Sequence, residues 1–307
     1  MSDESRAFEA GPSGVLDVAR KVAQTGLILP TEITQTARIV SADLKDVSTQ
    51  RIRSAITDVL LSPHAGRGLQ WMQEAGALAS LLPELDATVN FSQEAGRRHK
   101  DVWEHTKVVV AQSPMNPIVR WAALLHDIGK VSTRVLLPDG RVTFHRHAEL
   151  GAKMFSPIAR RLGFDRQERS RIRSLILYHL RANAYDGSWT DAAIRRFDLE
   201  MGDLLGDLAD LSRADVTSAR PGRREEVGRN IDALMERIRA VRDLDARVPP
   251  LPPGLGNAIM EAFSLQPSRR VGELRKVCED AIEAGTLVER QGSDYYVDYL
   301  RKQGISG

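Results

Sequence analysis

The 307-residue sequence contains a single cysteine, Cys278. One thiol cannot form an intramolecular disulfide, and it cannot supply the several thiolates of a cysteine-based zinc site. No apolar run approaches the roughly 20 residues that span a bilayer. The first residues, MSDESRAFEAGPSG, are polar and acidic at their start and do not resemble a signal peptide. We therefore expect a cytoplasmic protein with no membrane partner.

A strong overall charge is also missing, since the formal net charge is only +2. This balance gives no global basic field that would favour nucleic acid. Arginines are nevertheless concentrated in two regions, one with Arg160, Arg161, Arg166, Arg169, Arg171, Arg173 and Arg181, and one with Arg220, Arg223, Arg224 and Arg229. Such runs more often form a solvated helix face. A phosphate-bearing ligand is the alternative, and a neighbouring phosphate-handling site would favour it.

Strand patterns are scarce, whereas apolar residues recur at helical spacing along most of the sequence. The central helices that we expect span residues 98–112, 117–128, 146–162, 166–181, 190–198 and 200–217. One extended excursion at 136–144 contains Asp139-Gly140, which is a hairpin-type turn signal. Long helices joined by short turns predict an all-α fold, either a helical bundle or a stack of helix pairs.

The two ends of the sequence follow the same pattern. Helix is expected from Gly14, with Thr31 as the N-cap of the next helix and Ser48 or Thr49 as the N-cap of a third. In the last third we expect an arginine-rich linker and three helices before a polar end, at 220–229, 230–243, 257–263 and 271–284 respectively.

Histidine is rare, and its distribution is uneven. Of the seven histidines, five fall within one central stretch: His99, His105, His126, His145 and His147. A sixth, His179, follows on the next apolar helix. The pair His126-Asp127 ends the apolar stretch 120–125, where a polar pair is costly to bury unless something binds it. Imidazole nitrogen and carboxylate oxygen are common ligands of divalent first-row metals, so we expect a metal site here.

The expected metal ligands are histidines and aspartates that lie next to apolar residues on separate helices. They are His105, His126, Asp127, His147, His179 and Asp215. Six such ligands suit one or two divalent ions, with Asp127 as the bridge because a carboxylate has two oxygens. The ligand types do not fix the metal, which can be Mn, Fe, Ni, Co or Mg. Asp210 is the alternative to Asp215 on the same helix.

Two close metal ions can stabilise the attacking and leaving oxygens of a displacement at phosphorus, so no serine or cysteine nucleophile is required. We expect Asp127 and Lys130 to be the catalytic residues, with the Lys130 ammonium against the phosphate oxygens as charge develops. Gly129 would let the chain turn sharply enough for Lys130 to point back to the site.

Other polar residues nearby have weaker claims, because a lone histidine on an apolar face is more often a satisfied core residue than a ligand. We expect His99 and His145 to face the substrate or to support the ligands. Asp101 and Glu149 are expected to be helix caps or surface charges. The weaker candidates for phosphate contacts are Arg160, Arg161 and Arg181.

Together, His105, His126-Asp127 and Asp215 resemble the HD-domain superfamily of metal-dependent phosphohydrolases, and the set with His147 and His179 is similar to its two-metal members. The strings DVWEHT, RWAALLHDIGK, FHRHAELGA and LSRAD resemble one branch more closely, the bacterial tRNA nucleotidyltransferase (CCA-adding) and poly(A) polymerase family that carries an HD domain. VSTQRIRSAITDVLLSP and EAGALASLLPEL resemble its neck region, and GLGNAIMEAFSLQPSRRVGELRKVCEDAIEAGTL resembles its C-terminal body.

The composition and this resemblance imply four parts: a disordered tail at 1–13, a helical neck-like region at 14–90, an HD domain at 91–220 and a C-terminal helical region at 221–307. One part of the family pattern is missing. The family's catalytic head has a Gly-Gly/Ser turn followed by a paired-aspartate metal site. The sequence contains no Gly-Gly pair, and its nearest Asp-x-Asp, Asp243-Leu-Asp245, has no glycine turn before it. We therefore expect the head to be absent and do not carry over nucleotide addition.

The resemblance implies a metal-dependent phosphohydrolase or phosphodiesterase acting on a nucleotide or an RNA 3′ end, with 2′,3′-cyclic phosphates and related monoesters as the leading substrates by analogy. The alternative is a non-catalytic body that binds tRNA or other RNA, or the partner subunit of a separately encoded nucleotidyltransferase head. Loss of activity in Asp127→Ala with folding intact would favour the enzyme. RNA affinity that survives this change would favour the alternative.

Overall fold

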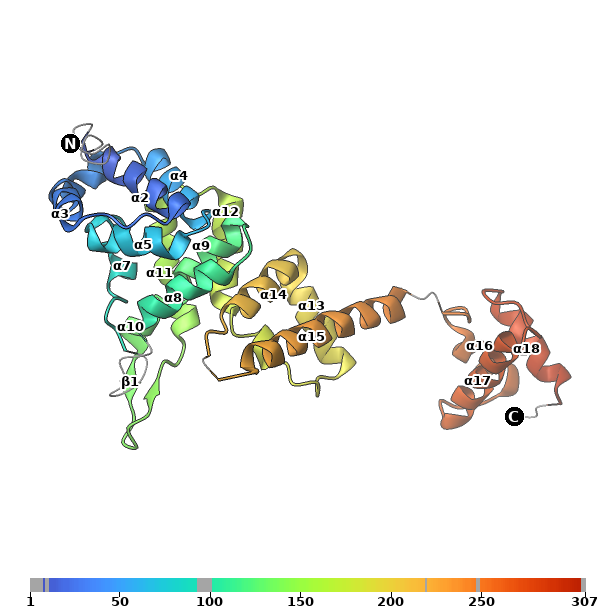
Figure 1. The fold of residues 1–307 in the computed structure, drawn as a ribbon. Helices are drawn as coiled ribbons and strands as arrows, with labels where there is room; N and C mark the ends of the chain where they lie inside the picture. The colour runs from blue at the N-terminus through green and yellow to red at the C-terminus, as the bar shows by residue number, and fades with distance from the viewer. Residues whose placement is uncertain (1–7, 9–10, 93–100, 219, 247–248, 305–307) are drawn as a thin grey trace. The chain divides into compact units, whose positions relative to one another are not determined.

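The structure is a computed structural model that describes residue 8 and residues 11–92, 101–218, 220–246 and 249–304 (Figure 1). Within these residues the regular secondary structure is helical apart from one short two-stranded hairpin, so the predicted all-α fold is confirmed. It divides into two compact units, Met1–Arg239 and Ala240–Gly307. Among the described residues, no helix combines the length and the apolar character needed to cross a membrane.

The first part of unit 1 is a cluster of short helices. Its elements are α2 (Ser13–Thr25), α3 (Thr31–Val40), η2 (Ser41–Asp46), α4 (Thr49–Leu60), α5 (Ala65–Glu74), α6 (Ala77–Leu81) and α7 (Pro83–Asp86). The buried face of α2 packs against α4 and α5. Ser48 caps α4, as predicted, because its hydroxyl accepts a hydrogen bond from the Arg51 backbone N–H. The prediction for Thr31 is wrong by one residue, since it is the first residue of α3 and Pro30 is the N-cap.

The second part of unit 1 contains longer helices. Its elements are α8 (Val102–Gln112), α9 (Pro117–Leu125), α10 (Lys130–Thr133), β1 (Val135–Leu136), β2 (Val142–Thr143), α11 (His147–Arg161), α12 (Arg166–Tyr178), η3 (Ala182–Ala184), α13 (Asp191–Met201), η4 (Gly202–Leu204) and α14 (Leu205–Ala214). The α-helices among them overlap the six ranges expected from the sequence. Asp101 caps α8 by accepting hydrogen bonds from the backbone N–H groups of Trp103 and Glu104.

Helix α9 is the centre of unit 1. Every residue from Val119 to Leu125 is buried, and α9 packs against α4, α8, α12 and α14. A short helix that is apolar on all sides is stable only when other elements surround it. The single exception in this run is Arg120, whose guanidinium donates to the carbonyl oxygens of Leu60, Ser113 and Pro114. These bonds connect the ends of α4 and α8 to α9.

The hairpin between α10 and α11 agrees with the sequence pattern. Its two strands are antiparallel, with Val135 opposite Thr143 and Leu136 opposite Val142. Gly140 has a φ of 81°, a left-handed conformation that favours glycine. The turn returns the chain to the start of α11.

Helix α15 (Arg223–Ala246) begins earlier than the sequence pattern indicated. Residues 223–229, which were expected to belong to a linker, form its first turns. Glu225 and Glu226 lie in the first turn, where carboxylates interact favourably with the helix dipole. Val227 and Ile231, four residues apart, are buried against Ala209 of α14. This apolar contact stabilises the arginine-rich stretch as part of the helix.

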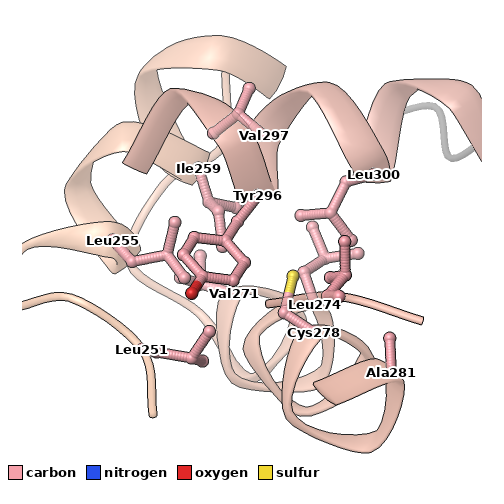
Figure 2. Close-up of a cluster of buried hydrophobic side chains, with 11 residues drawn as sticks. Leu251, Leu255, Ile259, Val271, Leu274, Cys278, Ala281, Tyr296, Val297 and Leu300 are labelled. Carbon is pink, nitrogen blue, oxygen red and sulfur yellow. The ribbon is translucent and has the colours of Figure 1, made fainter. Parts of the chain in front are cut away.

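Unit 2 has a core of its own, shown in Figure 2. It is formed by α16 (Leu255–Phe263), α17 (Arg269–Glu283) and α18 (Ser293–Lys302). The first two match the predicted helices, but the third lies where a polar end was expected, so that prediction is wrong. In α18, Tyr296 and Leu300 are buried among polar neighbours. The Tyr296 hydroxyl donates to the Val288 carbonyl and accepts from the Gln291 backbone N–H, so this buried phenol is fully satisfied.

Candidate metal centre

Six side chains positioned by five different helices meet inside unit 1. His105 lies within α8, and His147 is the first residue of α11. The others follow directly after helices, with His126 and Asp127 after α9, His179 after α12 and Asp215 after α14. Residues His126, Asp127, His147 and His179 are buried. These are the six residues that the sequence pattern selected.

The first group of donors surrounds His126. Its Nε2 lies 3.2 Å from Asp127 Oδ2 and 3.3 Å from Asp215 Oδ1. The Nε2 of His105 lies 3.0 Å from Asp215 Oδ1 and 3.2 Å from the Nε2 of His126. The Nε2 atoms of His105 and His126 therefore each lie within 3.5 Å of an oxygen of Asp127 and of an oxygen of Asp215.

The second group lies on the other side of Asp127. His147 Nε2 is 3.4 Å from Asp127 Oδ1 and 3.2 Å from His179 Nε2. Donor atoms of Asp127, His147 and His179 all fall within 4.8 Å of one another, as do those of His105, His126 and Asp127. Asp127 belongs to both groups and offers one oxygen to each. A carboxylate placed in this way could contribute one oxygen to each of two ions.

The histidine rings are held in one orientation by the backbone. Nδ1 of His126 lies 2.8 Å from the Ala123 carbonyl, and His147 and His179 make equivalent contacts with the carbonyls of Phe144 and Ile176. A carbonyl only accepts, so each Nδ1 donates and each Nε2 points into the centre, where it can bind a proton or a metal ion. Two Nε2 atoms that face each other at 3.2 Å repel unless a proton or a cation lies between them.

Asp127 gives a second reason to expect a cation. Its Oδ2 accepts from the Lys130 ammonium at 2.7 Å, whereas its buried Oδ1 has no hydrogen-bond partner among the described residues. A buried carboxylate oxygen without a partner is costly. Together with the facing Nε2 atoms, it shows that this donor set fits one or two divalent ions.

The charge balance of the site points the same way. Burial alone would lower the pKa of His126, but the carboxylates of Asp127 and Asp215 outweigh it and raise this pKa to about 10. Burial and the neighbouring His126 lower the pKa of His179 to about 4. Burial also opposes ionisation of the two aspartates, yet the charge of His126 holds the pKa of each below its usual range. The two carboxylates thus stay ionised, and positive charge is favoured between them.

Position 129 requires glycine for a different reason from the one expected from the sequence. Its φ is −69° and its ψ is −17°, a conformation open to any residue, so no special turn is required. A Cβ at this position would instead lie 2.1 Å from the His147 carbonyl oxygen and 2.8 Å from the Gly151 backbone nitrogen. Gly129 therefore permits close packing of the segment after Asp127 against α11, and this packing places Asp127 beside His147.

The proposed phosphate-contact residues lie apart from this cluster. Arg161 pairs with Glu84 at 2.7 Å and Arg181 pairs with Glu200 at 2.9 Å, so each guanidinium already has an acidic partner. Arg160 is exposed at the end of α11, and His145 is exposed just before that helix. His99 lies outside the described residues. Asp210 is close to Arg213 and takes no part in either group of donors.

A cavity of about 600 Å³ adjoins the cluster at Asp215. Besides Asp215, its polar lining residues are Asn183, Thr217, Ser218, Arg220, Arg223 and Asn230. Thr217 also links the cavity to the metal ligands, since its hydroxyl lies 2.8 Å from Nδ1 of His105. The arginine run at 220–229 was the sequence signal for this region. Asn183 and Asn230 carried no such signal, because they come together only in the folded chain.

Comparison with known proteins shows which family the sequence resembles. Residues 91–220 match the HD domain, and residues 31–88 match the probable RNA and SrmB-binding site of polymerase A. The chain is 32% identical over 302 residues to the A-adding tRNA nucleotidyltransferase of Deinococcus radiodurans, covering 94% of this chain and 68% of that enzyme.

Two further relatives agree with this result. The CC-adding tRNA nucleotidyltransferase of Thermus thermophilus is 31% identical over 261 residues, covering 82% of this chain and 57% of that enzyme. The Multifunctional CCA protein of Alkalilimnicola ehrlichii is 31% identical over 189 residues, covering 58% of this chain and 45% of that protein. The chain thus spans between about half and two thirds of the length of these relatives. It belongs to the family of tRNA nucleotidyltransferases that contain an HD domain.

Proposed function

We propose that the protein is a metal-dependent phosphohydrolase or phosphodiesterase of the HD type. Its substrate would be a nucleotide or an RNA-end phosphate, with a 2′,3′-cyclic phosphate or a phosphomonoester favoured. The observation that carries the proposal is the double donor set in which Asp127 offers one oxygen to each of two histidine groups. The match of residues 91–220 to the HD domain supports it independently.

The six residues divide between two metal positions in this proposal. His105, His126 and Asp215 would hold one ion and His147 and His179 the other, with Asp127 shared. When bound, such ions supply Lewis-acid polarisation of the phosphate and activation of water. The identity of the metal, among Mn, Fe, Ni, Co and Mg, follows from availability as much as from these ligands.

Residues of the chain would complete the site around the ions. Lys130 has three N–H donors, and the one on Asp127 Oδ2 holds its ammonium next to the metal positions, where charge develops on the phosphate. The adjoining cavity would receive the nucleoside part of the substrate, since about 600 Å³ lies within the usual range for small-molecule pockets. Arg220 and Arg223 would contact a further phosphate, and Asn183 and Asn230 would hydrogen-bond the base or ribose.

The test combines metal analysis with hydrolysis. Metal content of the purified protein and turnover of bis(p-nitrophenyl) phosphate and of 2′,3′-cyclic AMP are measured for the wild type and for Asp127→Asn. We expect bound metal and both activities in the wild type, and loss of all three in the variant. Asp210→Asn is the matched control, because Asp210 lies on the helix that precedes Asp215 but outside the donor groups. A wild type that binds no divalent ion and hydrolyses neither substrate would refute the proposal.

A second candidate function is binding of structured RNA without catalysis, alone or beside a separately encoded nucleotidyltransferase head. The observation in its favour is the match of residues 31–88 to an RNA-binding family. It predicts that a tRNA transcript binds the wild type and Asp127→Asn equally well. The cytoplasmic location expected from the sequence stays a prediction.

A further inference from the structure

A groove of about 260 Å³ lies along α11 and α12, apart from the metal cluster. Its polar lining residues are two serines and four arginines: Ser156, Arg160, Arg166, Arg169, Ser170 and Arg173. No carboxylate lines it. All four arginines are exposed, so the groove presents guanidinium groups and hydroxyls directly to the surroundings.

The arginines form a row because of their spacing. Arg166, Arg169 and Arg173 stand three and four residues apart, which places them along a single face of α12. Arg160 contributes a fourth positive charge from the end of α11. At a rise of about 1.5 Å per residue, the row on α12 extends for roughly 10 Å. This length exceeds a single phosphate group.

The carboxylates near the groove already have other partners. Glu168 is ion-paired with Arg53 at 2.9 Å. Asp165 caps α12 by accepting from the Glu168 backbone N–H, and Asp207 is paired with Arg171 on another face of the helix. None of the four groove arginines has an acidic partner among the described residues. Like charges at this spacing destabilise a helix slightly, and a bound anion would offset that repulsion.

The surroundings of the groove indicate which anion. Arg53 of α4 donates to the Gly163 carbonyl at 2.8 Å, and Arg161 pairs with Glu84. The turn between α11 and α12 is therefore anchored on residues 31–88, the segment that matches an RNA-binding family. A row of guanidinium groups suits successive phosphates, each of which can accept a bidentate pair of hydrogen bonds.

We infer that the groove between α11 and α12 is a contact surface for the phosphate backbone of RNA. The inference rests on the RNA-binding candidate above and is independent of hydrolysis at the metal centre. It places an RNA contact within the matched HD domain and outside residues 31–88. The serine hydroxyls would add neutral hydrogen bonds to the same phosphates.

The experiment measures binding of a fluorescently labelled tRNA transcript to the full chain by anisotropy, at several salt concentrations. The groove variant carries Arg166→Gln, Arg169→Gln and Arg173→Gln together. We expect its affinity to fall about tenfold or more near physiological salt, because each arginine that contacts a phosphate releases counterions. For the same reason, the slope of log affinity against log salt should become shallower by about two to three.

A second triple variant removes the same charge elsewhere, with Arg269→Gln, Arg270→Gln and Arg301→Gln in unit 2. We expect it to bind the transcript within about twofold of the wild type. Because all six positions are exposed, circular dichroism melts should show that both variants fold. Asp127→Asn should bind as the wild type does, which separates the groove from the metal centre.

Three results would overturn the inference. The groove variant could bind the transcript as tightly as the wild type, or the unit 2 variant could lose as much affinity. The wild type could also fail to bind the transcript, in which case the RNA-binding candidate falls with the groove. Binding to vesicles of phosphatidylserine that the groove variant loses, with RNA binding unchanged, would assign the surface to a lipid instead.

Discussion

Asp127 joins the two halves of the candidate metal centre through its two carboxylate oxygens. Oδ2 faces His126 and Lys130, whereas the unpartnered Oδ1 faces His147. The four histidines are not interchangeable, because each belongs to only one of the two donor groups. Single substitutions can therefore separate the two metal positions.

We expect His179→Gln to remove one metal position and leave the other. The wild type should hold about two ions per chain, His179→Gln about one, and Asp127→Asn neither, since only Asp127 contributes to both groups. Metal analysis by mass spectrometry after gel filtration provides the measurement. Equal metal content in His179→Gln and the wild type would contradict the assignment of His179 to a separate metal position.

The thiol of Cys278, in unit 2, gives a pH-dependent prediction that does not involve the metal ligands. Burial raises the pKa of Cys278 to about 11, and Glu279 adds to the effect. In the unfolded chain this pKa returns to about 8.5. The thiolate is the reactive form, so at pH 8 its fraction falls from about a quarter in the unfolded chain to about one in a thousand in the folded one.

We therefore expect Cys278 to react with a disulfide reagent at least about 100-fold more slowly in the native protein than in denaturant at pH 8. The direction of this pKa difference also determines how stability changes with pH. Ionisation is easier in the unfolded chain, so unit 2 should lose stability as the pH rises from about 8.5 towards 11. Reaction at the same rate in both states would show that the cysteine is accessible.

At the scale of elements, the segment Asp127–Lys130 connects α9 to α10 and passes close to α11. Helix α9 fixes the position of His126-Asp127 because its other residues are buried against four neighbouring helices. The close approach at Gly129 then fixes Asp127 relative to His147. The geometry of the site thus depends on packing between elements, and a small change in that packing should be measurable.

We expect Gly129→Ala to destabilise unit 1 by about 3 kcal/mol, since the added methyl group would meet backbone atoms that cannot move independently. Urea unfolding followed by circular dichroism measures the change. Gly206→Ala is the matched control, because that glycine lies in α14 with nothing within 4 Å of the added Cβ. It should leave stability unchanged or raise it by up to about 1 kcal/mol. Equal effects of the two substitutions would contradict the packing argument.

The helices were the part of the fold best predicted from the sequence. Apolar periodicity and local capping residues such as Ser48 and Asp101 act within a few neighbouring residues, so one sequence is enough to read them. Helix α18 was missed because its buried Tyr296 and Leu300 stand among polar residues and depend on contacts with α16 and α17. The early start of α15 was missed for the same reason.

The candidate ligands could be selected from the sequence because histidine is rare and clustered around His126-Asp127. Their convergence agrees with that selection. Gly129 was correctly singled out, but for a wrong reason, because a tight contact with α11 leaves no trace in the local sequence. The acidic partners of Arg161 and Arg181 were equally invisible, since Glu84 and Glu200 approach them only in the folded chain.

At the scale of the whole molecule, the chain contains two compact units, and the buried side chains of unit 2 form a cluster of their own (Figure 2). All six candidate metal ligands belong to unit 1. A core substitution in one unit should therefore leave the core of the other intact. Leu274 in α17 and Leu124 in α9 offer a matched pair, because each is only 1% exposed.

We expect Leu274→Ala to cost about 2–5 kcal/mol in unit 2 without changing the metal content of the protein. Hydrogen exchange should lose protection in α16–α18 and retain it in α9, α11 and α12. Leu124→Ala removes the same atoms from the helix that positions His126-Asp127, so it should lower both protection in unit 1 and metal binding. If Leu274→Ala released metal to the same extent, the centre would depend on unit 2, and the two cores could not be independent.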